Sequence, residues 1–231
     1  MFPPFSVSEA SQPLPTRRAI ESFPNCRVPL SYFGLPQYML DYYAKKGVHD
    51  LYEWQGRCLL MEGVLEGRNL SYTAPTSGGK SLVAEILMCR RVFHNPRRNR
   101  AIVVLPYVSL VVEKYEQLHS ILRGHAVQGE RLKVGCYYGS RVGMAGISDS
   151  KCGNHRREHV VVCTIEKANN IVNHLIKTNA IAKYRTVVVD EVHMMSDPKR
   201  GYLLEILVNK LLYLQCTRKI DLHLITISAT L

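Results

Sequence analysis

Ala74-Pro75-Thr76-Ser77-Gly78-Gly79-Lys80-Ser81 is the stretch of this sequence that decides the fold. A half-apolar run precedes it at 69–73, which predicts a strand, and apolar residues at helical spacing follow it at 82–87. Strand, glycine turn, Lys-Ser and helix form the context in which a phosphate-binding loop (P-loop) is recognised. The alternative is a glycine turn that opens a helix beside a chance Lys-Ser pair.

The chemistry of a P-loop explains each of these residue types. Glycines let the backbone turn tightly, so that its N–H groups can point at phosphate oxygens, and the start of the helix adds the positive end of its dipole. The lysine would reach the β- and γ-phosphates, and the following serine would offer its hydroxyl to Mg²⁺. The predicted ATP- and Mg²⁺-binding residues of the loop are Thr76, Ser77, Gly78, Gly79, Lys80 and Ser81.

An acidic pair supplies the second half of such a site. Residues 186–189 (Thr-Val-Val-Val) predict a buried strand that ends at Asp190-Glu191. Asp190 is predicted to hold Mg²⁺, and Glu191 to orient and polarise the attacking water. A helix N-cap is the alternative role for this pair. His193 is a further catalytic candidate, and a hydrogen bond to Thr230 would link it to the predicted strand 222–227.

Other polar residues follow predicted strands, where an open α/β sheet places its ligands. The strand 101–105 leads into Pro106 and Ser109, the strand 132–138 into Gly139-Ser140, and the strand 160–163 into Thr164 and Lys167. Backbone N–H groups and the small or basic side chains there are predicted to meet nucleic-acid phosphates. Thr164 is also a predicted helix N-cap. Upstream of the P-loop, the amide of Gln55 can both accept from and donate to an adenine edge.

Composition limits the classes of protein that fit. The chain has 231 residues, of which 46% are hydrophobic, enough for one sizeable domain. Its apolar runs fall short of the roughly 18–20 residues that a membrane helix needs, so we expect a soluble protein that does not span a membrane. The net charge of +11 indicates a polyanionic partner, nucleic acid first, although a solvated basic face is the simpler reading. Seven cysteines without paired spacing suit reduced thiols in the nucleus or cytosol.

Two segments are expected to lie outside the folded core. Residues 1–30 are rich in proline and predict a disordered or loosely docked tail, which leaves 31–231 as the domain. Residues 141–159 predict a flexible basic insertion. A zinc site at Cys152, His155, His159 and Cys163 is disfavoured, because the spacing matches no strong template and Cys163 falls within a predicted strand.

These segments, in this order, resemble the motifs of superfamily 2 DNA helicases. The common P-loop pattern has glycine at the position of Ala74, but the P-loop of that superfamily has alanine there. Gln55 resembles the adenine-reading Q motif of the same superfamily. Residues 74–81, 163–169 and 189–205 are most similar to the helicase domain of DNA polymerase theta and its close helicase relatives. The resemblance implies an α/β RecA-like fold, with a mostly parallel sheet and helices on both faces. It also implies ATP hydrolysis with Mg²⁺, movement on single-stranded or forked DNA, a role in DNA repair and a nuclear location, with Ser228 and Thr230 coupling nucleotide to DNA.

The same resemblance implies a second RecA-like domain that supplies arginine fingers. Its motifs do not follow residues 228–230 in this sequence, so we expect that domain to be absent here and hydrolysis by this chain to be weak. An RNA helicase of the same superfamily and a nucleic-acid-binding fragment without ATPase activity stay open as alternatives. A P-loop kinase is disfavoured, because Gln55, Thr164–Lys167 and Ser228–Thr230 would then all be coincidences.

Overall fold

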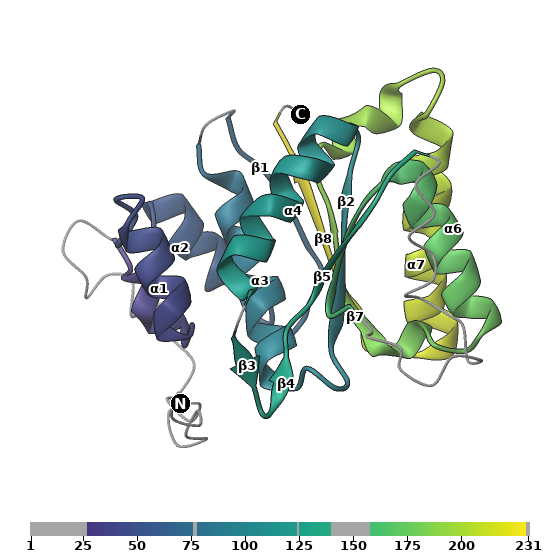
Figure 1. Cartoon of the computed structure of the whole chain (residues 1–231). Coiled ribbons are helices and arrows are strands. Elements are labelled where there is room, and N and C mark those ends of the chain that lie inside the picture. Colours follow the sequence, from purple (N-terminus) through teal and green to yellow (C-terminus); the bar gives the residue numbers. More distant parts are fainter. Residues whose placement is uncertain (1–26, 76–77, 124, 140–157, 230–231) are drawn as a thin grey trace.

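Six parallel strands form the centre of the molecule (Figure 1), in a computed structural model that describes residues 27–75, 78–123, 125–139 and 158–229. The sheet strands are β1 (Leu70–Thr73), β2 (Arg100–Leu105), β5 (Val134–Tyr137), β6 (Val160–Thr164), β7 (Tyr184–Val189) and β8 (His223–Ser228). A separate antiparallel hairpin consists of β3 (Ala126–Val127) and β4 (Glu130–Arg131). The α-helices are α1 (Gln37–Ala44), α2 (Glu53–Leu59), α3 (Lys80–His94), α4 (Val108–Leu122), α6 (Ile165–Lys177) and α7 (Gly201–Arg218). The 3₁₀ helices are η4 (Leu30–Phe33), η5 (Ile181–Lys183) and η6 (Val192–Ser196).

The strand order, β1-β8-β7-β2-β6-β5, brings the predicted site segments to one edge. Each neighbouring pair in this sheet runs parallel, and its register aligns the strand ends: Thr73 with Ser228, and Leu105 with Thr164. The carboxyl ends of the strands therefore lie together, at the top of Figure 1. That edge is where open α/β sheets hold ligands.

Helices cover both faces of the sheet. Successive side chains of a strand point to opposite faces, so each strand contributes to the core on both sides. Val103 and Val188 belong to the core cluster beneath α3 and α4, whereas Val104 and Val189 belong to the cluster beneath α6 and α7. Strands buried on both faces are apolar at nearly every position, as parallel sheets require. The predicted RecA-like arrangement, with helices on both faces, is confirmed (Figure 1).

The domain begins earlier than the predicted boundary at residue 31. Val28 and Leu30 are almost fully buried, and Leu30 N donates to His49 O at 3.0 Å. Pro29 forms an isolated β-bridge with Asp50. Apolar residues next to the prolines dock this segment on the core, so the assignment of 28–30 to the tail was wrong. Residues 1–26 lie outside the described part of the chain.

The predicted insertion also ends sooner than expected. Tyr137 donates its hydroxyl hydrogen to Glu158 Oε1 at 3.0 Å, and His159 N donates to Lys133 O at 2.8 Å. Residues 158–159 are thus bonded to β5 and to the residue before it, while 140–157 lie outside the described residues. Cys163 is fully buried within β6, and the described residues contain no cluster of three or more His, Cys, Asp or Glu able to hold a metal. Within the described chain, no helix is both long and apolar enough to cross a bilayer.

Candidate nucleotide-binding site

The described end of the loop after β1 requires glycine for its backbone conformation and close packing. Gly79 is the N-cap of α3 and has φ 74°, in the left-handed region that favours glycine. A Cβ added at Gly78 would lie 3.0 Å from Pro75 O. Tyr72 fixes the start of the helix, because its hydroxyl donates to Lys80 O at 2.5 Å. Thr76 and Ser77, also predicted to bind nucleotide, lie outside the described residues.

Gln55 contacts the loop directly. Its Nε2 donates to Gly79 O at 2.8 Å, and its Oε1 accepts from Tyr52 N at 2.8 Å at the start of α2. Gln55 is only 2% exposed, and a Cβ on Gly79 would lie 2.6 Å from its Nε2. The structure thus brings Gln55 to the P-loop. Its role in reading adenine stays a prediction.

The basic and acidic halves of the site meet at Lys80 and Glu191. Lys80 Nζ lies 2.8 Å from Glu191 Oε1, with both side chains largely shielded from solvent. Glu191 has φ 54°, a left-handed conformation that is rare for a residue with a Cβ. Such backbone strain clusters at functional sites, and here it turns the chain from β7 into η6.

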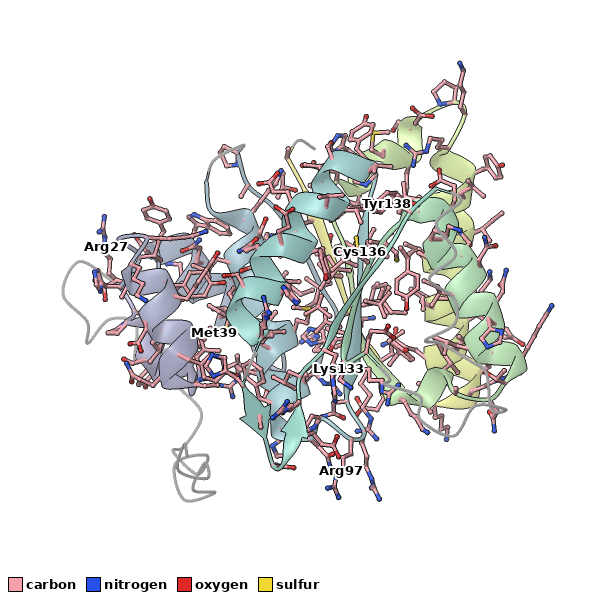
Figure 2. All side chains as sticks on the ribbon, viewed as in Figure 1. Arg27, Met39, Arg97, Lys133, Cys136 and Tyr138 are labelled. Carbon is pink, nitrogen blue, oxygen red and sulfur yellow. The ribbon has the colours of Figure 1, made fainter. Side chains whose placement is uncertain are left out.

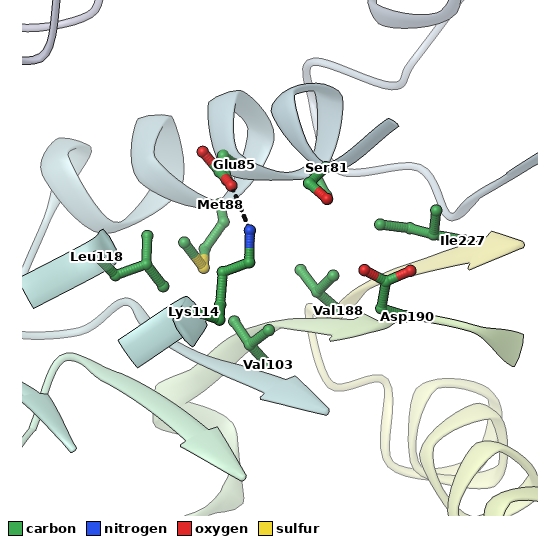
Figure 3. Close-up of a pocket in the computed structure, with 10 residues that line it drawn as sticks. Ser81, Glu85, Met88, Val103, Lys114, Leu118, Val188, Asp190 and Ile227 are labelled. Atoms are coloured by element: carbon green, nitrogen blue, oxygen red, sulfur yellow. Dashed lines mark hydrogen bonds and ion pairs between the residues drawn. The ribbon is translucent and has the colours of Figure 1, made fainter. Parts of the chain in front are cut away.

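Ser81 and Asp190 line one small cavity between α3 and the sheet, with a volume of about 20 Å³ (Figure 3). Burial raises the pKa of the Asp190 carboxyl above its ordinary value, and the neighbouring charge of Glu191 adds to the rise. A cation beside this carboxylate would favour its charged form. A hydroxyl and a carboxylate are the hard oxygen ligands that Mg²⁺ prefers alongside phosphates, so these residues fit the predicted metal.

His193 contacts the end of β8 at Ser228. Its Nδ1 lies 3.4 Å from Ser228 Oγ and 3.3 Å from Glu191 Oε2. Thr230, the predicted partner, lies outside the described residues. The end of β8 is therefore joined to the acidic segment at Ser228, and the bond from His193 to Thr230 stays a prediction.

The predicted nucleic-acid contacts lie along the same edge. Pro106 follows β2, Gly139 follows β5, and Thr164 and Lys167 lie at the end of β6 and in the first turn of α6. Figure 2 shows β5 from Lys133 at its start to Tyr138 after its end, next to Gly139. Ser109 is exposed in the first turn of α4. Thr164 is the N-cap of α6 but makes no side-chain capping hydrogen bond, and Ser140 lies outside the described residues.

Sequence reasoning missed a buried ionic network behind the site. Lys114 Nζ of α4 lies 2.7 Å from Glu85 Oε1 of α3, and both residues line the same cavity as Ser81 and Asp190 (Figure 3). Tyr43 of α1 also donates to Glu85. The available signal was a charged residue inside an otherwise apolar stretch, because Glu85 is flanked by Ala84 and Ile86.

The fold and the site define a class of protein. A strand–loop–helix with Gly79 and Lys80, facing an acidic pair at the end of a parallel strand that is separated from it by β8, is the architecture of a RecA-like P-loop NTPase domain. The sequence profile of the DEAD/DEAH box helicases matches residues 57–231. This chain belongs to the DEAD/DEAH box helicase family, and membership implies the use of ATP.

Individual relatives agree with this assignment. The chain is 44% identical over 202 residues to DNA polymerase theta of Mus musculus, covering 87% of this chain and 7% of that protein. It is 37% identical over 217 residues to Helicase POLQ-like of Homo sapiens, covering 93% of this chain and 18% of that protein. The crystal structure of the DUF1998 helicase MrfA bound to DNA and AMPPNP has the same fold, with a TM-score of 0.69 at 19% identity over 89% of this chain and 27% of that one. The chain thus spans under a fifth of the two curated relatives.

Proposed function

We propose that this chain is the ATP-binding motor domain of a DNA helicase or translocase of the DNA polymerase theta type. ATP hydrolysis would be coupled to movement on single-stranded or forked DNA, and the protein would act in DNA repair in the nucleus. The observation that carries the proposal is the meeting of Lys80 and Glu191 at 2.8 Å, beside Ser81 and Asp190. The names of the relatives support the DNA substrate and the repair role.

The residues would divide the work as follows. Lys80 and the loop N–H groups would hold the β- and γ-phosphates, and Ser81 and Asp190 would hold Mg²⁺. When bound, Mg²⁺ supplies positive charge that neutralises the phosphate oxygens. Glu191, now paired with Lys80, would orient the attacking water and accept its proton once phosphate competes for the lysine. A second RecA-like domain in the whole protein would complete the site.

The test is a thermal unfolding titration with ATP·Mg²⁺ on the wild-type chain and on Lys80→Ala. A ligand that binds only the folded state stabilises it by about 2.7 kcal/mol at about 100 times its Kd. We expect the wild-type melting temperature to rise with ligand and that of Lys80→Ala to stay constant. Lys183→Ala removes the same charge at an exposed position in η5 and should respond like the wild type. Equal shifts in all three proteins would contradict the assignment of Lys80.

Substrate preference is tested by anisotropy with labelled single strands of DNA and RNA of one sequence, over a range of salt concentrations. Binding to backbone phosphates weakens as salt rises, and a 2′-hydroxyl contact favours RNA. We expect DNA to bind with a clear salt dependence. Tighter binding of RNA at every salt concentration would favour the RNA helicase alternative.

A further inference from the structure

Arg200 connects two of the predicted nucleic-acid segments. It is the N-cap residue of α7, ten positions after Asp190 in the chain. Its Nε lies 2.7 Å from Glu166 Oε1 in the first turn of α6. Its Nη2 donates to Pro106 O, at the end of β2, at 2.7 Å.

The backbone at Arg200 is held in place by the residues that precede it, Met195 and Asp197. Asp197 Oδ1 accepts from Arg200 N at 2.8 Å and from Lys199 N at 2.9 Å. Gly201 N donates to Asp197 O at 2.8 Å. A Cβ on Gly201 would lie 2.1 Å from Met195 O, so the turn between η6 and α7 closes only with glycine there. The backbone that carries Arg200 is thus tightly packed against the segment that follows the acidic pair.

The planar guanidinium fixes the separation of its two acceptors. A guanidinium presents its N–H groups in a rigid fork, whereas an ammonium is a single point charge on a flexible stem. Because Arg200 bonds Glu166 and Pro106 at once, it sets the position of the start of α4 relative to the start of α6. Pro106 and Ser109 belong to the first of these segments, and Thr164 and Lys167 to the second.

We infer that Arg200 is a positioning residue for single-stranded nucleic acid: it holds the segments 106–109 and 164–167 in a fixed position relative to each other, without contacting phosphate itself. This inference rests on the proposed function, because it takes both segments to be the binding surface. It adds a residue outside the predicted binding set, and it ties that surface to the segment that leaves the nucleotide site.

A second ion pair in the chain provides a matched control. Arg97 Nε lies 2.9 Å from Glu130 Oε1, so the two pairs share the same atoms and nearly the same geometry. Figure 2 shows Arg97 at the end of the molecule opposite the carboxyl ends of the strands. The two pairs are partly exposed, so each contributes little to stability and the variants should fold.

The experiment measures binding of a labelled oligo-dT to the 231-residue chain by fluorescence anisotropy, for the wild type and for variants of both pairs. We expect Arg200→Ala to weaken binding about threefold to tenfold, the equivalent of one net hydrogen bond. Arg200→Lys should also weaken it, because a lysine keeps the charge but loses the fork. Arg97→Ala should leave binding within about twofold of the wild type, as surface charges far from a site do.

For Glu166→Gln, an effect of charge alone and an effect of positioning change the binding affinity in opposite directions. Removing a negative charge near a phosphate-binding surface strengthens binding if charge alone matters. A glutamine offers Arg200 only a neutral acceptor, so the weaker bond to Arg200 weakens binding if position matters. We expect weaker binding for Glu166→Gln and no change for Glu130→Gln. The slope of log K against log salt should stay at the wild-type value in Arg200→Ala, because a residue that touches no phosphate releases no counterion.

The outcomes separate the inference from the function on which it rests. If the wild-type chain fails to bind oligo-dT, the proposed function and this inference both fail. If the wild type binds and Arg200→Lys or Glu166→Gln binds as well or better, Arg200 does not position the surface. A salt slope reduced by about one would show that Arg200 contacts a phosphate directly, which also overturns the inference. The shift in melting temperature with ATP·Mg²⁺ should persist in every variant, which confirms that each remains folded.

Discussion

Single residues at the P-loop carry two separate constraints, and Gly79 carries both. Its φ of 74° disfavours any residue with a Cβ, and its Cβ position lies 2.6 Å from Gln55 Nε2. Either constraint alone would favour glycine. Together they make this position a sensitive point of the site.

Gly79→Ala should therefore lose the rise in melting temperature with ATP·Mg²⁺ and lower the free energy of unfolding by about 1–3 kcal/mol. Gly129→Ala isolates the backbone contribution, because Gly129 has φ 78° and no atom within 4 Å of its Cβ position. We expect Gly129→Ala to cost less and to leave nucleotide binding intact. Equal losses of stability in the two variants would show that the contact with Gln55 is unimportant.

Some residues of the candidate site could be predicted from the sequence, and others could not. Lys80, Ser81, Asp190 and Glu191 could be predicted as a set, because their chemistry is local to a loop and to a strand end. The hydrogen bond from Gln55 to Gly79 O and the two bonds of Arg200, to Glu166 and to Pro106 O, could not be predicted from the sequence. Both depend on side-chain directions between segments that are distant in the sequence, which no local pattern records.

Helices α3 and α4 are joined by a buried ion pair at the level of secondary-structure elements. Glu85 and Lys114 have side chains only 6% and 15% exposed, at a contact of 2.7 Å. Burial lowers the pKa of Lys114, but the charge and hydrogen bond of Glu85 outweigh it and the net shift is upward. The lysine therefore stays charged, and removing its partner leaves a buried charge uncompensated.

Glu85→Gln and Lys114→Met should each lower the free energy of unfolding by about 3–5 kcal/mol, measured by urea denaturation. The double variant should recover a large part of that loss, since it removes both charges. The exposed pair Arg57–Glu53, at 2.5 Å, is the control, and its removal should cost at most about 1 kcal/mol. Strictly additive losses in the double variant would contradict a direct coupling.

Most elements could be predicted, because buried parallel strands are apolar runs in the sequence. The runs at 101–105, 160–163 and 186–189 became β2, β6 and β7. The short β3–β4 hairpin was missed, since two-residue strands carry no periodicity. The predicted tail boundary was wrong for a different reason. The proline-rich composition of residues 1–30 indicated a tail, although Val28 and Leu30 at its end are apolar and dock on the core.

The stability of the whole molecule should depend on pH through two buried histidines. Burial, with the positive charges of Arg100 and Arg91 respectively, lowers the pKa of His159 and of His223 from 6.5 to about 4. Each is neutral in the folded chain and takes up a proton more readily when unfolded. Between pH 6.5 and about 4 the unfolded state binds more protons, so stability is complete above 6.5 and falls as the pH drops.

We expect each histidine to account for a loss on the order of 1–3 kcal/mol across that window, measured by urea denaturation at a series of pH values. His159→Gln and His223→Gln should flatten the dependence of stability on pH, each by its own share. His49→Gln, at an exposed position, should leave the slope unchanged. A slope that persists in the double variant would assign the effect to carboxylates instead.

The side chain of Gln55 has more hydrogen-bonding capacity than its two bonds in the structure use. Its amide nitrogen carries two hydrogens, of which one is donated to Gly79 O, and its amide oxygen has two lone pairs, of which one accepts from Tyr52 N. These two bonds leave one hydrogen and one lone pair of the planar amide unused. Adenine presents the complementary acceptor and donor, whereas the same edge of guanine presents two acceptors. If Gln55 reads adenine as predicted, this remaining capacity would distinguish one purine from the other while Gln55 still holds the loop.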